Sequence, residues 1–414
     1  ETTIALSIFL YILLVVILTL VFTSPLLFIR TILNKISINS DLYVILVISS
    51  FLILSELSRY FLLNGVPWLI PGNIYLDTLT QNIYPLFGVT LTSYLIYILC
   101  SYLAISYHKK NRLFIPILLI VFSVLPSFNK TFELEEGLTI SIVQPSSDPF
   151  LKYDNNYYST IEDNLIKLLM SSSKTSEIVV IPEAELPYPI QSTNFNRFIN
   201  KIDNKDKLIM GVWDVEDNLV YNSIYNLKNN NSYKKTHLVP FGEYIPFVSS
   251  LRGLIGFFDL PMSNVSHGPK NQENILIMNN VNVATPICFD IAFANTVRKM
   301  NKSSFLMINI SNDTWFGNSI GPHHHLSISR VRSIENNRWT IRATNDGISA
   351  IINNKGTIVD KLDKGTSGIL EGKVELIEKN SFYNRFGYLL SYIISFIIVS
   401  LSLSKYLWKK FLIK

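Results

Sequence analysis

The chain alternates between long apolar stretches and a middle region of short apolar runs. No Asp, Glu, Lys or Arg occurs between residues 2 and 29, and residues 3–22 form an apolar run long enough to cross a bilayer as a helix. Four further runs are too long and too uniformly apolar for buried strands: 42–63, 83–107, 113–128 and 386–404. The pattern therefore predicts five membrane-spanning helices, the one at 113–128 being the shortest.

Basic residues predict the orientation of these helices. Arg30 and Lys35 follow the first run, whereas residues 64–82 contain no Lys or Arg. Two more basic clusters lie between the third and fourth runs and after the last one: Lys109, Lys110, Arg112, Lys405, Lys409, Lys410 and Lys414. Because short cytoplasmic loops carry the excess of Lys and Arg, we expect all three clusters to be cytoplasmic. The region between the fourth and last runs then lies on the opposite side of the membrane.

Residues 137–380 have the pattern of a separate α/β domain. Polar helical stretches at 154–170 and 323–338 alternate with runs typical of strands buried on both faces. These runs are 138–144, 176–183, 207–213, 281–289 and 305–311. Residues 338–362 add hairpin strands with Asn-Asp-Gly and Asn-Lys-Gly turns. We therefore expect an α/β domain between membrane helices in 1–130 and a last span at 386–404, followed by a basic tail at 405–414.

Composition narrows the class of protein. Of 414 residues, 48% are hydrophobic and 16% are charged, which is apolar for a soluble protein. The net charge of +5 is small and the basic residues do not form one tract, so no nucleic-acid partner is expected. The two cysteines are Cys100, inside the apolar run "YLIYILC", and Cys288. We expect no disulfide between them and a free thiol at Cys288.

Three candidate sites share one position, the carboxyl end of a predicted strand or the loop after it, where α/β sheets bind ligands. Glu183 lies in "IPEAELP", Lys235 and Glu243 lie in "YKKTHLVPFGEY", and Cys288 lies in "TPICFDIAF". A carboxylate can accept the proton of a thiol, and an ammonium can stabilise the thiolate and then an oxyanion. The backbone N–H of Phe289 is a candidate second oxyanion donor. Together these groups would make an activated nucleophile.

Each of these residues alone has an ordinary explanation. A Cys at a strand end is most often a small core residue, a Glu after Pro is usually a solvated loop acid, and a Lys-Lys pair is usually surface charge. The "HHH" run at 323–325 predicts no metal site, because consecutive helical side chains point about 100° apart and no Cys or carboxylate pattern joins them. We expect His325 to pack or hydrogen-bond near the site, and we expect neither a metal ion nor a cofactor.

Several motifs together resemble the nitrilase superfamily, whose Glu-Lys-Cys triad lies on an αββα sandwich, and more narrowly the apolipoprotein N-acyltransferases, its integral membrane members. The motifs cover nearly the whole chain and include "SELSRYFLLNGVPWL", "IPEAELP", "YNSIYNL", "YKKTHLVPFGEYIPF", "PICFDIAF" and "NISNDTWFGNSIGPHHH". The resemblance implies an α-helical transmembrane bundle plus an α/β nitrilase-like αββα sandwich domain. It also implies that the family's first spans precede this sequence.

By this resemblance the general base falls on Glu183, the nucleophile on Cys288, and the lysine on Lys235, which stands two residues before His-Leu-Val-Pro. Glu243 matches a further carboxylate that orients the lysine and the thiol. Glu185, two residues after the base, is interpreted as a bystander.

The resemblance also assigns substrate or oxyanion contacts. Phe289 and Asp290 stand where the family often has Tyr-Glu, Tyr153 stands where a tryptophan is common near the membrane-facing cleft, and Trp315 lies in a turn beside the cleft. For Trp315, scaffold and substrate contact stay open. The aromatic residues of 251–262 predict either a lid at the bilayer surface or core packing.

The function that the resemblance implies is phospholipid-dependent N-acylation of the N-terminal diacylglyceryl-cysteine of apolipoproteins, by a ping-pong mechanism through a thioester on Cys288. Its partners would be a membrane phospholipid as acyl donor, diacylglyceryl-modified lipoproteins as acceptors, and the lipid bilayer. The expected location is the bacterial inner membrane, with the catalytic domain facing the periplasm. The alternatives are a nitrilase-type amidase that hydrolyses a small amide and a non-catalytic membrane receptor with the same fold.

Overall fold

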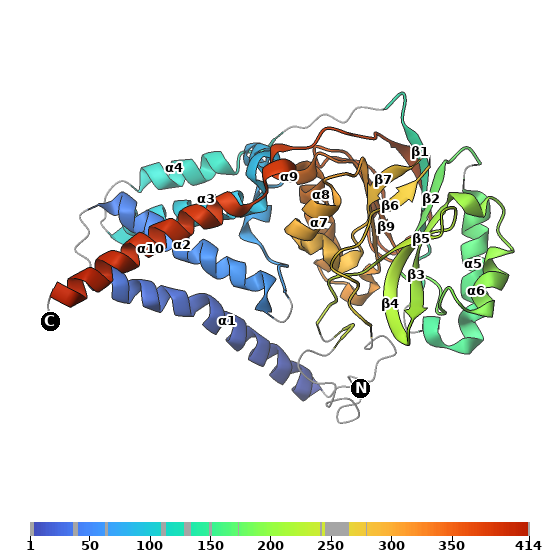
Figure 1. The fold of residues 1–414 in the computed structure, drawn as a ribbon, viewed down its shortest axis with the longest axis horizontal. Coiled ribbons are helices and arrows are strands. Elements are labelled where there is room, and N and C mark those ends of the chain that lie inside the picture. Colours follow the sequence, from blue (N-terminus) through green and yellow to red (C-terminus); the bar gives the residue numbers. More distant parts are fainter. Residues whose placement is uncertain are drawn as a thin grey trace. The chain divides into compact units, whose positions relative to one another are not determined.

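The computed structural model describes residues 4–35, 40–62, 65–108, 113–127, 134–148, 151–172, 174–240, 242–244, 265–278 and 280–412. The chain divides into two units, one of residues 1–128 with 386–414 and one of residues 129–385 (Figure 1).

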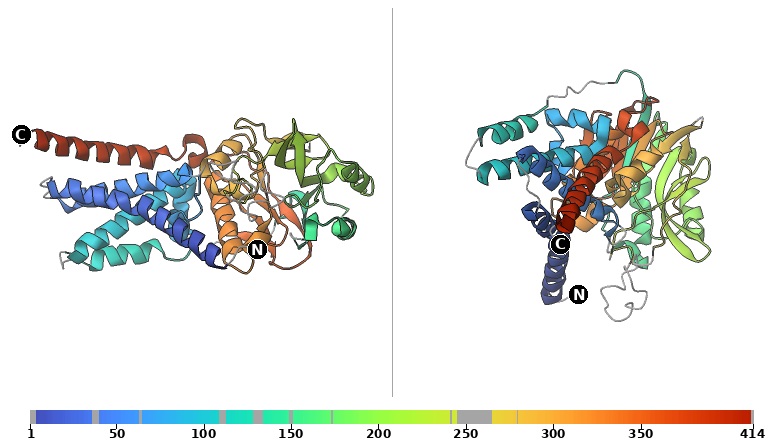
Figure 2. Two further views of the ribbon diagram at one scale, coloured as in Figure 1. Left: turned by 90° about the horizontal axis from the view of Figure 1, so that it is seen from below. Right: turned by 60° about the vertical axis from the view of Figure 1, so that its left-hand side comes forward.

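The first unit is helical. Its α-helices are α1 (Ile4–Lys35), α2 (Asp41–Leu57), α3 (Tyr84–His108), α4 (Phe114–Ser123) and α10 (Leu389–Leu412). Short 3-10 turns at Ser58–Tyr60, Pro71–Tyr75 and Leu79–Ile83 lie between α2 and α3. Helix α2 packs against α1, α3 and α10, which lie side by side with it in both views of Figure 2.

Four helical segments of the described chain are long and apolar enough to cross a membrane: Tyr11–Leu33, Asp41–Tyr60, Leu79–His108 and Leu389–Trp408. The predicted span at 113–128 differs from expectation. Helix α4 has ten residues, and at 1.5 Å per residue it is about 15 Å long, half of a hydrocarbon core of about 30 Å. The apolar run 113–128 would itself span only about 24 Å as a helix, and the helix formed within it is shorter still.

The second unit contains two six-stranded sheets. The first sheet has the order β12-β1-β2-β3-β4-β5 and the second has the order β11-β10-β9-β8-β7-β6. The strands of the first sheet are β1 (Leu138–Gln144), β2 (Ile178–Ile181), β3 (Leu208–Glu216), β4 (Leu219–Asn226), β5 (Asn231–Lys234) and β12 (Gly368–Val374). Those of the second are β6 (Ile275–Ile277), β7 (Val281–Ala284), β8 (Leu306–Ser311), β9 (Thr340–Thr344), β10 (Ser349–Ile352) and β11 (Ile358–Leu362).

The central strands β1, β2 and β3 are parallel to one another, as are β7, β8 and β9, and antiparallel strands complete each sheet. The two sheets pack face to face, because β1 contacts β9 and β12 contacts both β10 and β11. The approach is close at Gly372 of β12, where a Cβ would lie 2.5 Å from Cδ1 of Ile351 in β10. A larger residue there would fit only if the end of the Ile351 side chain moved, so the glycine allows the two sheets to approach closely at this point.

Helices cover the two outer faces (Figure 1). Helices α5 (Tyr158–Ser171) and α6 (Thr193–Ile199) bury Leu165 and Phe198 against β2 and β3 of the first sheet. Helices α7 (Ala294–Met300) and α8 (Gly321–Asn336) cover the second sheet, where α8 contributes Leu326 to a core with Ala350 and neighbouring residues of β10. The short helix α9 (Phe382–Phe386) follows β12. The unit is therefore the predicted αββα sandwich, which confirms the predicted fold class together with the helical unit.

The predicted strands form at the predicted positions, but some of them end earlier than the apolar runs do. The run 176–183 becomes the shorter β2, because Pro182 has no N–H to continue the ladder. The run 281–289 ends at Ala284, two residues before Pro286, and Cys288–Ala292 form a 3-10 turn instead of a strand. These early ends place Glu183 and Cys288 in loops beyond the sheets.

Candidate active site

The site is built at the carboxyl ends of strands from both sheets. Glu183 follows β2 and Lys235 follows β5 in the first sheet, while Cys288 begins the turn after β7 in the second. The backbone of Glu183 lies against β3 at Gly211, where a Cβ would be 2.5 Å from the Cα of Glu183. A glycine at this point of β3 lets the chain of the candidate base lie against the sheet.

Lys235 lies between two carboxylates in the interior of the unit. Its Nζ is 2.9 Å from Oε1 of Glu183 and 2.8 Å from Oε1 of Glu243, and its side chain is 1% exposed. The amide of Asn222 donates to the same two oxygens, at 2.6 Å to Glu183 and 3.3 Å to Glu243. A buried ammonium with two carboxylates leaves a net negative charge beside the thiol.

Backbone N–H groups fix the other oxygen of each carboxylate. Oε2 of Glu183 accepts from the N–H of Asn312 at 2.7 Å, and Oε2 of Glu243 accepts from the N–H of Val239 at 2.8 Å. Asn312 lies in the loop after β8 of the second sheet, whereas Glu183 follows β2 of the first sheet. A backbone N–H from the second sheet therefore fixes the side chain of the candidate base. Charge-assisted bonds of this length are the strong ones, and they leave each carboxylate in one orientation.

The ammonium of Lys235 stays charged in this environment. Burial alone would lower the pKa of Lys235, but the neighbouring sulfur of Cys288 and the carboxylates of Glu183 and Glu243 raise it well above its ordinary value. A lysine in this state cannot act as a base. It can stabilise a thiolate or an oxyanion through its charge.

Cys288 has a strained backbone and a protonated thiol. Its φ angle of 44° lies in the left-handed region, which costs a non-glycine residue about 1–3 kcal/mol and occurs most often at functional sites. Burial raises the pKa of Cys288, as do the carboxylates of Glu183 and Glu243, whereas Lys235 lowers it, and the net direction is upward. The thiol therefore needs a base to remove its proton at the moment of attack.

Asp290 does not face a substrate in the structure. It is 0% exposed, and its carboxylate accepts from the N–H of His237 at 2.7 Å, the hydroxyl of Tyr233 at 3.2 Å and the N–H of Ile287 at 3.3 Å. Burial raises the pKa of Asp290 to about 7. These bonds hold the turn around Cys288, and a polar contact from Asp290 to substrate stays a prediction. Phe289 is also buried, and its ring packs edge-on against Phe293.

The remaining predicted contacts stay predictions. Trp315 lies in the 3-10 turn Asp313–Phe316, and its side chain is 49% exposed. The side chain of Tyr153 and the aromatic residues of 251–262 lie outside the described residues. Among the residues that are described, no group of three or more His, Cys, Asp or Glu side chains could hold a metal ion.

A second buried ion pair lies next to the candidate base. Nζ of Lys152 is 3.8 Å from Oε2 of Glu185, and neither side chain is more than 1% exposed. Oε1 of Glu185 accepts from the hydroxyl of Ser147 at 2.7 Å. Burial lowers the pKa of Lys152 and raises the pKa of Glu185. Glu185 is therefore a buried, paired group, and its interpretation as a bystander in catalysis stays a prediction.

Sequence reasoning missed Lys152 and Asn222 as members of this region. Asn222 had a signal, because it lies in the motif "YNSIYNL". Lys152 had none, because no local pattern distinguishes it from a surface lysine.

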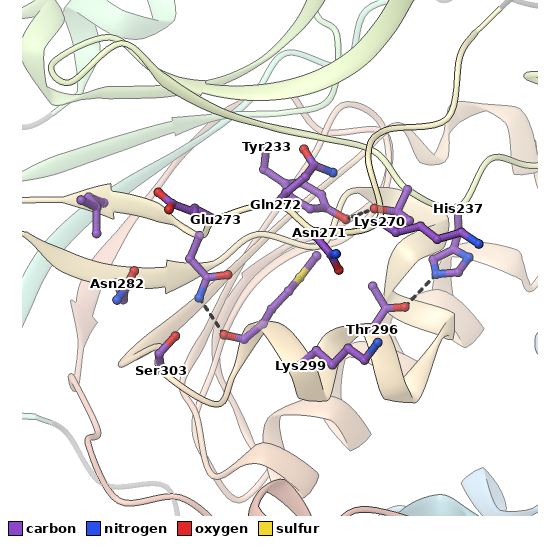
Figure 3. A pocket seen from close by; sticks show the side chains of 14 residues that line it. Tyr233, His237, Lys270, Asn271, Gln272, Glu273, Asn282, Thr296, Lys299 and Ser303 are labelled. Atoms are coloured by element: carbon purple, nitrogen blue, oxygen red, sulfur yellow. Dashed lines mark hydrogen bonds between the residues drawn. The ribbon is translucent and has the colours of Figure 1, made fainter.

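A pocket of about 890 Å³ lies near the site, and Glu183, Lys235 and Cys288 are not among its lining residues (Figure 3). Tyr233 and His237, which both donate to Asp290, form part of its wall. Nε2 of His237 is 2.7 Å from the hydroxyl of Thr296, and its ring stacks on Phe293 at a centroid distance of 3.5 Å. The pocket is thus a neighbour of the site and not the site itself.

Comparisons with known proteins identify the family of this chain. A family model for the apolipoprotein N-acyltransferase N-terminal domain matches residues 1–103, and one for the carbon-nitrogen hydrolase matches residues 139–378. The apolipoprotein N-acyltransferase of Wigglesworthia glossinidia brevipalpis is 30% identical over 353 residues, 81% of this chain and 70% of the relative. That of Shewanella oneidensis is 28% identical over 358 residues, 81% of this chain and 68% of the relative.

Among solved structures, a carbon-nitrogen hydrolase from Helicobacter pylori has a TM-score of 0.42 and 16% identity, covering 58% of this chain and 89% of that chain. The family models match both parts of the sequence, and the curated relatives match most of its length. The chain therefore belongs to the apolipoprotein N-acyltransferase family.

Proposed function

We propose that this protein is a membrane acyltransferase that transfers an acyl chain from a phospholipid to the α-amine of the N-terminal diacylglyceryl-cysteine of a lipoprotein, through a thioester on Cys288. The observation that carries the proposal is the buried cluster of Glu183, Lys235 and Glu243 beside the Cys288 thiol. Family membership and four helices suited to cross a membrane support lipid-anchored substrates.

In the first half-reaction the sulfur of Cys288 attacks the ester carbonyl of the phospholipid. Glu183 accepts the thiol proton as the S–C bond forms, and Lys235 with the Phe289 N–H stabilises the oxyanion. Collapse of the tetrahedral intermediate breaks the C–O bond, and the proton on Glu183 passes to the departing lysophospholipid oxygen. The product is an acyl thioester on Cys288.

In the second half-reaction the free α-amine of the lipoprotein attacks the thioester carbonyl. Glu183, ionised again, accepts a proton from the amine as the C–N bond forms. The C–S bond then breaks, and the sulfur takes up that proton and returns to the thiol. Positioned general acid–base catalysis of this kind contributes about 10²–10⁴ in rate.

The other polar groups of the site keep the base and the cation in place. Glu243 and Asn222 fix Lys235 and Glu183 against each other, and the N–H of Asn312 holds the second oxygen of Glu183. With two carboxylates around one ammonium, Glu183 can change its protonation state while Glu243 still neutralises Lys235.

The distribution of basic residues supports a multi-pass protein of the bacterial inner membrane. Under the positive-inside rule the catalytic residues 137–380 face the periplasm and the tail 405–414 is cytoplasmic. Both proposed substrates are anchored in lipid, so an enzyme in the same membrane meets both of them.

The second candidate function is a nitrilase-type amidase, which the match to the carbon-nitrogen hydrolase family model favours. In that reaction Cys288 attacks a small amide, and water in place of an amine attacks the thioester. The site geometry serves either acceptor, so the two functions differ in the second half-reaction.

The deciding experiment incubates the chain in detergent micelles with phosphatidylethanolamine and a synthetic diacylglyceryl-cysteine peptide whose α-amine is free. We expect an N-acylated peptide, none from the Cys288→Ala variant, and none from an N-acetylated control peptide. Release of free fatty acid with an unmodified peptide would replace the proposal by a hydrolase. Equal product from wild type and Cys288→Ala would exclude the thioester.

A further inference from the structure

A buried histidine connects the second sheet to the backbone of the nucleophile. His325 lies in the first turns of α8 and is 0% exposed. Its Nδ1 is 2.8 Å from Oδ1 of Asp313, and its Nε2 is 3.2 Å from the carbonyl oxygen of Cys288. The ring of Phe316 meets the imidazole edge-on. The imidazole therefore bridges a carboxylate and the peptide group that follows the nucleophile.

Asp313 is held as a carboxylate by two further donors. Nη2 of Arg342 is 2.7 Å from its Oδ2, and the hydroxyl of Ser311 donates to its Oδ1 at 2.6 Å. Burial would raise the pKa of Asp313, but Arg342 and His325 hold it well below its ordinary range. Arg342, Asp313 and His325 are all 0% exposed, so this chain of contacts is shielded from solvent.

Both contacts of the His325 ring are to acceptors. A carboxylate oxygen and a backbone carbonyl have no proton to give, so each contact is a hydrogen bond only if the ring nitrogen donates. Both bonds form together only in the imidazolium, which carries one proton on each ring nitrogen, whereas a neutral ring donates to one of the two acceptors at a time. Burial and Arg342 lower the pKa of His325 more than Asp313 and the Cys288 carbonyl raise it, so the net direction is downward. The position of Nε2, 3.2 Å from a carbonyl oxygen that can only accept, favours the form with a proton on Nε2.

The bond to the Cys288 carbonyl determines where the next N–H points. A peptide group is planar and trans, so its C=O and N–H point in opposite directions. Fixing the carbonyl of Cys288 on His325 therefore directs the N–H of Phe289 away from α8. The left-handed φ of 44° at Cys288 is a strained conformation that needs such external support.

We propose that His325, anchored by Asp313 and Arg342, is a positioning residue that holds the Cys288–Phe289 peptide group so that the Phe289 N–H meets the oxyanion. His325 acts through the backbone and touches neither the acyl donor nor the amine. The inference rests on the proposed function, because the oxyanion forms only when Cys288 is acylated or deacylated.

The test compares two reactions of the same thiol. Iodoacetamide alkylates a thiol by displacing iodide from a saturated carbon, so sulfur bonds to carbon, iodide leaves, and no oxyanion forms. Acylation by p-nitrophenyl palmitate or by phosphatidylethanolamine passes through a tetrahedral oxyanion and releases p-nitrophenol or the lysophospholipid. A residue that positions the oxyanion donor should affect acylation and spare alkylation.

The variant is His325→Gln, and the control is His323→Gln, the same change at an exposed position of the same helix. We expect acylation of Cys288 by the p-nitrophenyl ester to slow by up to about 100-fold in His325→Gln, because misplacing a catalytic group costs that much. Alkylation by iodoacetamide should be little changed, and His323→Gln should match wild type in both reactions. Equal losses in the two reactions, or no loss of acylation, would overturn the inference.

Ser311→Ala gives a milder test that applies even if His325→Gln does not fold. It removes one donor to Asp313 and leaves both contacts of His325, so acylation should fall by several-fold while alkylation stays constant. Unchanged acylation in this variant would count against the anchoring role of Asp313. If wild type reacts with the p-nitrophenyl ester and not with phosphatidylethanolamine, the proposed acyl donor fails while the comparison still decides the role of His325. No acylation by either ester overturns both.

Discussion

The two sheets of the second unit contribute to one site in different ways. The first sheet and its loops supply charge, with the Lys235 ammonium between the carboxylates of Glu183 and Glu243. The second sheet supplies backbone geometry, with the left-handed Cys288 and its carbonyl held by His325. The difference indicates that changes on the first sheet should alter proton transfer and charge, whereas changes on the second should alter the position of the nucleophile.

The largest expected effect comes from the central cation of the first sheet. Lys235→Met leaves the carboxylates of Glu183 and Glu243 buried without their ammonium, so we expect a loss of about 3–5 kcal/mol in the free energy of unfolding. Thioester formation should fall by about 10²–10³ because the oxyanion loses a donor. Chemical denaturation and the rate of acylation measure the two effects.

The neighbouring lysine provides a matched control for this change. Lys234 is partly exposed and pairs with Glu216 near the surface, and such pairs contribute about 0–1 kcal/mol. Lys234→Met should therefore leave stability and rate near wild type. Comparable losses in the two variants would contradict the assignment of the catalytic cation to Lys235.

On the second sheet, crowding Asp313 should disturb the support of the nucleophile. A Cβ at Gly347 would lie 2.6 Å from Oδ2 of Asp313, which is buried and paired with Arg342. We expect Gly347→Ala to cost about 1–3 kcal/mol of stability, as overpacking does, and to slow acylation. Gly368→Ala is the control, because its nearest neighbour atoms are 4.0 Å away. A stable Gly347→Ala protein with full activity would show that the position of Asp313 is unimportant.

Glu243 should matter less than Lys235. In Glu243→Gln the lysine keeps its contact with Glu183, and the side-chain carbonyl can still accept from the N–H of Val239. Loss of one charge-assisted bond of about 1.5 kcal/mol corresponds to about a tenfold slower acylation. The steady-state rate of acylation checks this, with thermal unfolding as the control that the variant is folded. A loss of rate as large as that of Lys235→Met would give Glu243 a direct part in proton transfer.

The smallest expected effect is on the pH dependence of stability. Burial lowers the pKa of His237 from 6.5 to about 4. Between these two pH values the imidazole is protonated in the unfolded chain and neutral in the folded chain, so the free energy of unfolding increases as the pH is raised from 4 to 6.5. Burial raises the pKa of Asp290 from 3.8 to about 7. Between these two pH values the carboxyl is protonated in the folded chain and ionised in the unfolded chain, so the free energy of unfolding decreases as the pH is raised over about the same interval. In wild type the two contributions oppose each other.

Removing one of the two groups should reveal the other. In Asp290→Asn the contribution of His237 remains, so stability should be greater at pH 6.5 than at pH 4.5, by on the order of 1–2 kcal/mol relative to wild type. Urea denaturation at the two pH values measures it. A variant that loses stability on going to pH 6.5 would contradict the lowered pKa of His237.

Hydropathy and motif together predicted the layers of the fold and the positions of its candidate residues. Runs of apolar residues located β1, β3 and β8 because strands buried on both faces need them. The end of α4 could not be predicted, because hydropathy does not determine where a helix stops. Glu183, Lys235 and Cys288 became candidates because each lies in a specific motif of the family that the sequence resembles.

The contacts among the supporting residues could not be predicted in the same way, although His325 was expected to pack or hydrogen-bond near the site, as it does. Arg342, Asp313 and His325 meet only because the fold brings β9, the loop after β8 and α8 together. The direction of a short side chain in a turn is also not encoded locally, so the hydrogen bonds of Asp290 with His237 and Tyr233 could not be predicted. Local sequence patterns identify charged residues at the ends of strands. Which of these side chains contact one another depends on how the two sheets pack.

The most direct test is rapid-quench intact-mass analysis of the protein mixed with phosphatidylethanolamine, in wild type, Glu183→Gln and Cys288→Ala. We predict that wild type gains the mass of one acyl chain, that hydroxylamine removes it, and that fragmentation places it on Cys288. Glu183→Gln should gain it about 10²–10⁴ times more slowly, and Cys288→Ala should never gain it. An adduct that persists in Cys288→Ala, or one that forms equally fast in Glu183→Gln, would contradict the claim that charge from the first sheet activates the thiol of the second.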